Sequence, residues 1–111
     1  MLRPAQKGSS LYRIGVMVAA LLGAATTACA SETLARQRNC MNCHGMERKI
    51  VGPGLKQVAA RYAGKKEAPA YLAEKIVKGG AGAWGPVAMA ANPHVSQEEA
   101  LRLALWVLSL K

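Results

Sequence analysis

Apolar residues divide the chain into one unbroken N-terminal run and several segments with helical periodicity. In the run, residues 14–25, every position is apolar or glycine. Further along, apolar residues recur three and four positions apart, which is the spacing of a helix that buries one face. We therefore predict four short helices after the run. No alternating pattern of useful length indicates a β fold.

The first two predicted helices lie on either side of a Cys-x-x-Cys-His segment. The first covers about residues 32–39 and ends at the cysteine pair. The second follows Pro53-Gly54. Its apolar stripe is made of Leu55, Val58, Ala59 and Tyr62, at positions i, i+3, i+4 and i+7.

The last two predicted helices have the clearest boundaries. The third runs from about Ala68 to Lys78, with Pro69 in its first turn and Gly79-Gly80 to end it. The fourth begins after Ser96, which is expected to form a capping box with Glu99. We expect its buried face to consist of Leu101, Ala104, Leu105 and Leu108, with Trp106 at the edge.

The segment between these helices, residues 80–95, is rich in Gly, Ala and Pro and has no regular period. A loop of about 15 residues in a small domain is usually functional or disordered. This one contains Trp84, Pro86, Met89, Asn92 and His94. Their side-chain chemistry favours a functional loop.

The N-terminal run has the features of a secretory signal peptide. Three basic residues precede it, Arg3, Lys7 and Arg13, and small residues follow it at 26–30. Its 12 residues fall short of the ~20 that a spanning helix needs, which disfavours an uncleaved anchor. We expect cleavage after Ala30, giving a signal peptide at 1–30 and one domain at 31–111. A lipidated Cys29 is the other alternative, but Thr26 stands where lipoproteins usually carry leucine.

Positive charge dominates the predicted mature domain. Residues 31–111 contain twelve Lys and Arg against six Glu, and the chain has no Asp. Export argues against nucleic acid as a partner, so the charge better suits an acidic docking patch on a protein. Simple solubility is the explanation that charge alone leaves open. The candidate docking residues are Lys56, Lys65, Lys66 and Lys78.

Cys40, Cys43 and His44 form the motif that attaches c-type haem. Two thiols three positions apart on a helical turn can each form a thioether with a haem vinyl group, and the next residue brings its imidazole to the iron. A thioredoxin-like pair would need a βαβ context, a zinc site four ligands, and a plain disulfide would leave His44 unexplained. The motif predicts one haem c, attached through Cys40 and Cys43 and ligated by His44.

An electron-transfer haem also needs a ligand on the opposite face of its iron. Met41 lies between the two cysteines and Met46 follows His44 closely, so both are tethered to the proximal side. Met89 lies 45 residues beyond His44 and is free to reach the distal side. We expect Met89 to be the sixth ligand, since His/Met ligation recurs in electron carriers. His94 and an open site are the alternatives.

Together these motifs resemble the small bacterial class I cytochromes c of the c-551 type, over nearly all of residues 31–111. The matching segments are Cys40–His44, Val51-Gly52-Pro53, Val58-Ala59-Ala60, Lys78-Gly79, Trp84-Gly85-Pro86-Val87, Met89 and Leu105-Trp106-Val107-Leu108-Ser109. The resemblance implies an all-α class I cytochrome c fold of about four short helices around one covalent haem. It also implies a monomeric electron carrier in the periplasm of a Gram-negative bacterium, which is not an enzyme.

The resemblance assigns further roles around the haem. It implies that the Pro53 carbonyl accepts a hydrogen bond from His44, that Trp84 donates its indole N–H to a haem propionate, and that Asn92 lies beside the axial sulfur. Pro53 could instead only start a helix, Trp84 only pack in the core, and Asn92 only make a turn. The redox partners implied by the family are a bc-type complex, a terminal oxidase or a nitrite reductase.

Two positions depart from the family pattern. Ala90-Ala91 follow Met89 where relatives commonly have prolines, which raises the entropy of the unfolded loop and predicts a softer Met89 loop. Ala35 stands beside Leu34 where an aromatic residue is expected, which predicts thinner packing between the first and last helices. A labile Met89 would favour the main rival function, a gas-binding haem sensor. A small haem peroxidase is the second rival, although the distal segment offers no acid–base pair beyond His94.

Overall fold

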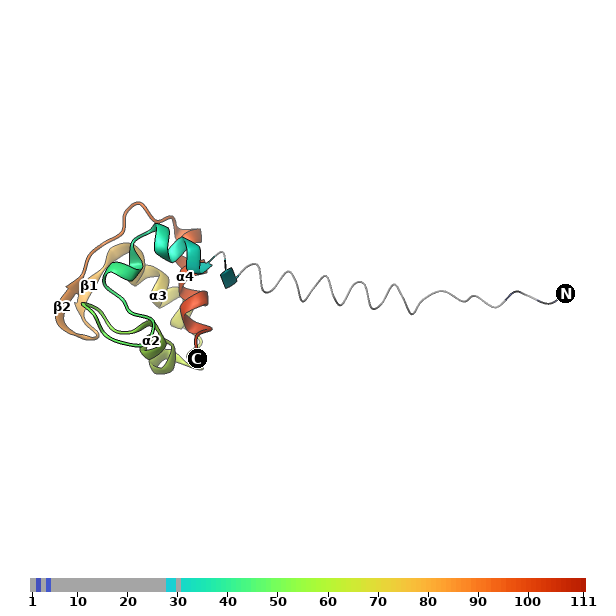
Figure 1. The fold of residues 1–111 in the computed structure, drawn as a ribbon, viewed down its shortest axis with the longest axis horizontal. Helices are drawn as coiled ribbons and strands as arrows, with labels where there is room; N and C mark the ends of the chain where they lie inside the picture. The colour runs from blue at the N-terminus through green and yellow to red at the C-terminus, as the bar shows by residue number, and fades with distance from the viewer. Residues whose placement is uncertain (1, 3, 5–27, 30) are drawn as a thin grey trace.

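The structure of the chain, a computed structural model, describes residues 2, 4, 28, 29 and 31–111 (Figure 1). The predicted signal peptide falls almost entirely outside these residues, and so does its predicted cleavage site at Ala30. In the part of the chain that is described, no helix is long and apolar enough to cross a membrane.

Helices occupy the four positions that the apolar pattern predicts within residues 31–111. Residues 31–37 are helical, and α2 (Leu55–Tyr62), α3 (Ala68–Lys78) and α4 (Gln97–Leu108) follow. The first helix ends slightly earlier than expected, because Asn39 adopts a left-handed conformation with φ of 62°. A short 3-10 helix, η1 (Cys40–Asn42), then begins the cysteine motif.

The predicted capping box at the start of α4 is present. The Ser96 hydroxyl accepts a hydrogen bond from the Glu99 amide at 3.1 Å, and the Glu99 carboxylate accepts one from the Ser96 amide at 3.3 Å. The same carboxylate pairs with Arg38 at 2.8 Å, which ties α4 to the end of the first helix. The hydrogen bond from Arg38 lowers the pKa of Glu99, and the bond from the Ser96 amide adds to this effect.

The buried face of α4 differs from the predicted one. Leu101 and Leu105, which we expected in the core, are 42% and 51% exposed, and Leu108 is half-buried. The buried residues are Ala100, Leu103, Ala104, Trp106 and Val107. Both sets fit the period of a helix, so periodicity could not distinguish them. The fully buried Ala100 and Ala104 present small side chains, which let neighbouring helices approach closely.

The core lies where α4 packs against α2 and α3. The first helix adds Leu34 and Ala35 to this core, and Ala35 is only 1% exposed. No polar or charged side chain is buried among the described residues. The helices therefore enclose an apolar interior, and the 3-10 turn and the loop after it lie along its edge (Figure 1).

The segment predicted as an irregular loop contains a β-hairpin, which corrects that prediction. Strands β1 (Gly80–Gly82) and β2 (Gly85–Met89) pair in antiparallel fashion around Ala83 and Trp84 (Figure 1). The pairing escaped detection because both strands are largely exposed, so no apolar residue alternates with a polar one. Gly80, Gly82 and Gly85 also have positive φ, which makes the ladder irregular.

Candidate functional site

A cavity of about 1000 Å³ lies between the helices and the hairpin. Its walls come from the first helix, η1, the loop that follows it, α2, α3, both strands and α4. Most of the lining side chains are apolar. Ligand pockets usually span ~300–1,000 Å³, so this cavity is large for so short a domain.

Two cysteines and a histidine enter the cavity from η1 and the residues just after it. The amides of Cys43 and His44 both donate to the Cys40 carbonyl, at 3.3 Å and 3.1 Å, which folds the motif into a tight turn. Cys40 is half-buried, and this burial raises the pKa of its thiol. Cys43 is exposed but also lines the cavity. The turn therefore places both thiols and the imidazole at one wall.

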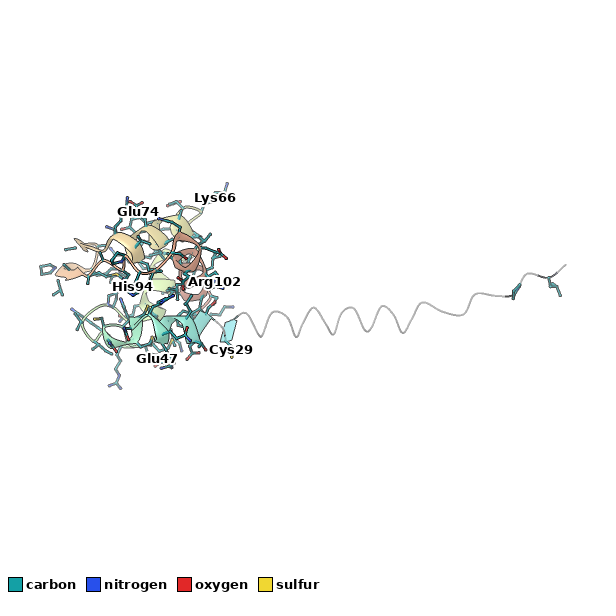
Figure 2. The ribbon with its side chains drawn as sticks, turned by 90° about the horizontal axis from the view of Figure 1, so that it is seen from above. Cys29, Glu47, Lys66, Glu74, His94 and Arg102 are labelled. Atoms are coloured by element: carbon teal, nitrogen blue, oxygen red, sulfur yellow. The ribbon has the colours of Figure 1, made fainter. Side chains whose placement is uncertain are left out.

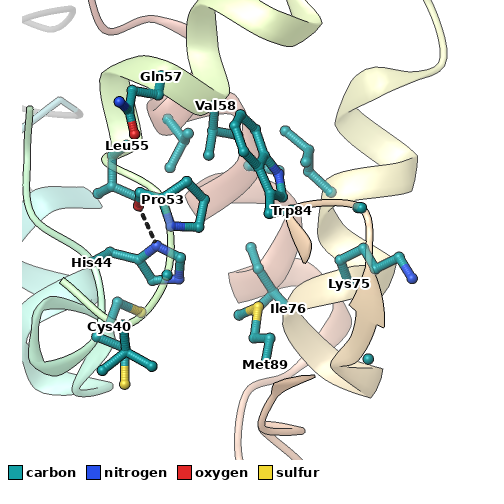
Figure 3. Close-up of a pocket in the computed structure, with 18 of the residues that line it drawn as sticks. Cys40, His44, Pro53, Leu55, Gln57, Val58, Lys75, Ile76, Trp84 and Met89 are labelled. Atoms are coloured by element: carbon teal, nitrogen blue, oxygen red, sulfur yellow. Dashed lines mark hydrogen bonds between the residues drawn. The ribbon is translucent and has the colours of Figure 1, made fainter. Parts of the chain in front are cut away.

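The His44 ring is oriented by the loop that returns from the motif to α2. Its Nδ1 lies 2.7 Å from the Pro53 carbonyl oxygen, as the dashed line in Figure 3 shows. A carbonyl can only accept a hydrogen bond, so Nδ1 is the donor and Nε2 is the ring nitrogen left for a metal. The histidine is thus held in the tautomer that can ligate a metal through Nε2.

Gly52 is a residue whose role the sequence did not reveal. A Cβ at this position would lie 3.0 Å from His44 Nδ1 and 2.6 Å from Cε1, and the second distance is shorter than real Cβ contacts. The amides of Val51 and Gly52 both donate to the Cys43 carbonyl, at 3.0 Å and 2.8 Å, so the loop has little freedom to move away. The Gly52-Pro53 pair before α2 could have indicated this role, since glycine is used where the backbone approaches another group closely.

Met89 ends strand β2 on the wall that faces the histidine. Figure 3 shows Met89 and Ile76 across the cavity from His44 and Cys40. The chain after Met89 is anchored by Asn92, whose side-chain amide donates to the Ile76 carbonyl at 2.8 Å and to the Ala90 carbonyl at 3.4 Å. The segment that carries Met89 is therefore tied to the last turn of α3.

Trp84 belongs to a cluster of aromatic and cationic side chains at the cavity. The Arg61 guanidinium lies 4.3 Å from the centre of the Trp84 ring, and Lys75 lies over Tyr71 at 5.7 Å. Tyr62 and Tyr71 pair at 5.6 Å between ring centres. All of these residues line the cavity. Arg61 and Lys75 were not among the predicted site residues, because basic side chains on helices are common on solvated surfaces.

The structure brings all seven predicted site residues to this cavity: Cys40, Cys43, His44, Pro53, Trp84, Met89 and Asn92. His94, the alternative sixth ligand, is exposed and is not among the lining residues. Met41 and Met46 also stay outside it and pack against the core. In the described chain, no group of three or more His, Cys, Asp or Glu side chains is arranged to hold a metal ion by itself.

The residues around the cavity fit a haem. The apolar walls suit its macrocycle, and two thiols in one turn suit its two vinyl groups. Arg61 and Lys75 bring positive charge to the lining, which suits carboxylate groups on the cofactor. His44 offers a neutral imidazole nitrogen as an iron ligand.

Known proteins are similar to this chain in sequence and in fold. The family model described as cytochrome c matches residues 29–111. A cytochrome c-552 from Nitrosomonas europaea is 46% identical over 98 residues, which cover 88% of this chain and 95% of the relative. A cytochrome c-551 from Pseudomonas aeruginosa is 48% identical over 80 residues, which cover 72% of this chain and 76% of the relative.

Solved structures give the same result. The crystal structure of wild-type Nitrosomonas europaea cytochrome c552 matches with a TM-score of 0.70 and 49% identity. The match covers 72% of this chain and 99% of the other. Because family model, relatives, fold and cavity agree, this chain belongs to the class I cytochromes c of the c-551/c-552 type, which are electron carriers with one covalently attached haem c and not enzymes.

Proposed function

We propose that this protein is a periplasmic carrier of single electrons whose haem iron is ligated by His44 and Met89. The observation that carries the proposal is the position of these two side chains on facing walls of one cavity (Figure 3). His94 offers a weaker alternative, because it is exposed and does not line the cavity.

The chain prepares both ligands. The hydrogen bond to the Pro53 carbonyl fixes the His44 ring and makes Nε2 a better donor. Met89 supplies a thioether, which favours ferrous iron and so raises the reduction potential. When bound, the haem supplies the one-electron redox chemistry, and the chain supplies ligands, an apolar surround and limited access.

Three further residues support the ligands in this proposal. Pro53 orients His44 through its carbonyl. Asn92 holds the residues after Met89 against the carbonyl of Ile76. Trp84, 39% exposed at the hairpin turn, would donate its indole N–H to a haem propionate.

The partners that we propose are redox proteins with an acidic docking surface. Ile50, Val51 and Val87 are 58%, 48% and 60% exposed, and the last two line the cavity. Lys49, which precedes Ile50 in the chain, has no ion-pair partner among the described residues. An apolar patch beside unpaired positive charge suits a transient electron-transfer contact.

Two of the predicted docking lysines are already engaged within the protein. Lys56 pairs with Glu47 and Lys78 with Glu74, each at 3.0 Å. Lys65 and Lys66 have no such partner in the described chain. We therefore assign the docking charge chiefly to Lys49, Lys65 and Lys66.

The periplasmic location rests on the predicted signal peptide at residues 1–30. The basic start, the short apolar run and the small residues at 26–30 support it. N-terminal sequencing of the exported protein tests this part: a mature chain that starts at Ser31 supports it. An uncleaved chain contradicts the signal peptide, whereas a chain that starts at a lipidated Cys29 contradicts only the cleavage site after Ala30.

Optical spectra of the native protein and of Met89→Ala test the ligation. We expect a covalent haem c spectrum in both, and a weak far-red ferric band of sulfur ligation that the Met89→Ala substitution abolishes. Met46→Ala is the matched control, because Met46 lies outside the cavity and should leave the band intact.

Other outcomes would separate the alternatives. If the native protein lacks the far-red band and its reduced form binds carbon monoxide, Met89 is not a firm ligand and the gas-sensor reading gains support. If haem is removed by acid extraction, the covalent attachment itself is wrong.

A further inference from the structure

The β1–β2 hairpin is held only weakly by its own packing. Every residue of β1 is exposed, and in β2 only Met89 is half-buried. Gly80, Gly82 and Gly85 adopt positive φ, so the strands also contain the residues with the greatest backbone freedom. An isolated two-stranded hairpin is at best marginally stable in water, so this one needs attachments to the rest of the protein.

One attachment is at the base of the hairpin. Gly79 is buried between α3 and the returning chain, and a Cβ there would lie 2.4 Å from the Met89 carbonyl oxygen. The backbone amide of Asn92 donates to the Val77 carbonyl at 3.0 Å, two residues before Gly79. These contacts fix the end of β2 but do not reach the opposite end of the hairpin.

The other attachment is at the tip, and it comes from one side chain of α2. Arg61 donates from Nη1 to the Ala83 carbonyl at 2.6 Å, and its guanidinium lies 4.3 Å from the centre of the Trp84 ring. Ala83 and Trp84 are the two residues that join the strands. Within the described chain, this is the one hydrogen bond between residues 80–89 and any residue outside that segment.

We propose that Arg61 is a positioning residue that clamps the hairpin tip to α2 and thereby limits movement of Met89. With the base fixed and the tip clamped, β2 is restrained at both ends. A planar guanidinium can donate in its plane while its face stacks on an indole, which a lysine ammonium cannot do. The effect on Met89 rests on the proposed ligation, whereas the clamp itself does not.

Hydrogen exchange of the haem-loaded protein tests the clamp. In Arg61→Met we expect the hairpin amides of residues 80–89 to exchange about tenfold faster than in the native protein, because opening of the segment becomes easier. Arg61→Lys, which keeps the charge, should show most of the same increase. Lys65→Met is the matched control: Lys65 also lies over an aromatic ring, at 5.4 Å from Tyr62, but bonds to no hairpin residue.

Imidazole binding to the ferric protein tests the consequence for Met89. An external ligand must displace the sixth ligand, so a looser Met89 should raise the apparent imidazole affinity about tenfold in Arg61→Met, which corresponds to ~1.4 kcal/mol. Lys65→Met should bind imidazole as the native protein does.

The outcomes separate this inference from the proposed ligation. Unchanged hairpin exchange in Arg61→Met, or an equal increase in Lys65→Met, overturns the clamp. Faster exchange with unchanged imidazole affinity overturns the effect on Met89. A native protein without the far-red band overturns Met89 ligation, while the exchange rates still decide the clamp.

Discussion

At the scale of single residues, the His44 ring depends on the absence of a side chain at position 52. Pro53 holds the ring through its carbonyl, and Gly52 lies against the ring itself. The two adjacent residues thus act in different ways, one by a hydrogen bond and the other by leaving space. Iron ligation at this wall is sensitive to both.

We predict that Gly52→Ala displaces the His44 ring and lowers the free energy of unfolding by ~1–3 kcal/mol, the usual cost of overpacking. The added methyl would lie 2.6 Å from His44 Cε1. Chemical denaturation and the visible spectrum, followed together, measure the two effects.

Gly64→Ala provides the contrast. Gly64 has φ of +72°, but no atom lies within 4 Å of a Cβ built there. We expect that variant to lose stability through backbone strain with an unaltered haem spectrum. If Gly52→Ala also leaves the spectrum unaltered, Gly52 is not needed to place the ring.

At the scale of elements, how much could be predicted depended on how each element is stabilised. The last three helices were predicted because each has an apolar stripe or a boundary signal, such as Ser96 with Glu99, and the first was predicted from its position before the cysteine pair. The hairpin was missed because its strands bury almost nothing. On α4, Ala104 was predicted correctly, but Leu101 and Leu105 were preferred as core residues to the smaller Ala100, although Ala100 is the buried one. Cavity residues were predicted from chemically distinctive side chains and a family resemblance. Arg61 had neither feature, and Gly52 lay in a matching segment but has no side chain to indicate its role.

The contact between the first helix and α4 predicts a pH dependence. The pKa of Glu99 is lowered in the folded protein by Arg38 and by the Ser96 amide. Its contribution to stability is therefore complete above the ordinary glutamate pKa and is lost as the pH falls through the lowered folded-state value. Glu99→Gln should lower the melting temperature at neutral pH but not in strong acid.

Glu98→Gln is the control for this prediction. This substitution removes the same charge from the same first turn of α4. Unlike Glu99, Glu98 has no ion-pair partner in the described chain. Thermal unfolding across the acid range measures both variants. If Glu98→Gln produces the same pH profile, the general effect of charge near the helix start accounts for the result and the Arg38 contact does not.

At the scale of the whole molecule, some lysines are paired with glutamates and others are free to contact a partner protein. Lys56 and Lys78 form surface ion pairs with neighbouring glutamates, whereas Lys49 is unpaired beside the exposed Ile50 and Val51. Part of the unpaired charge, that of Lys49, therefore lies next to the exposed Ile50 and Val51. This distribution suits a partner that must approach the cavity edge and leave again quickly.

We predict that Lys49→Glu slows reduction by an acidic redox protein several-fold at low salt and flattens the dependence of the rate on ionic strength. Arg102→Glu is the control, since Arg102 lies on α4, on the side away from the hairpin (Figure 2). Stopped-flow measurement at several salt concentrations gives both quantities. Equal slowing by the two variants would show that net charge matters and its location does not.

The cavity of about 1000 Å³ makes the stability of the chain depend on its cofactor. Without its cofactor, the apolar lining of this cavity is exposed to water, which removes much of the hydrophobic stabilisation on which a domain with a net stability of only ~5–15 kcal/mol depends. We therefore expect a chain that never receives its cofactor to be less stable and more open to proteases. Because thioether attachment is covalent, a chain that has received its haem keeps it and stays stabilised, whereas a chain without haem is left for degradation. Cellular abundance of the protein should therefore follow the supply of haem more closely than the rate of translation.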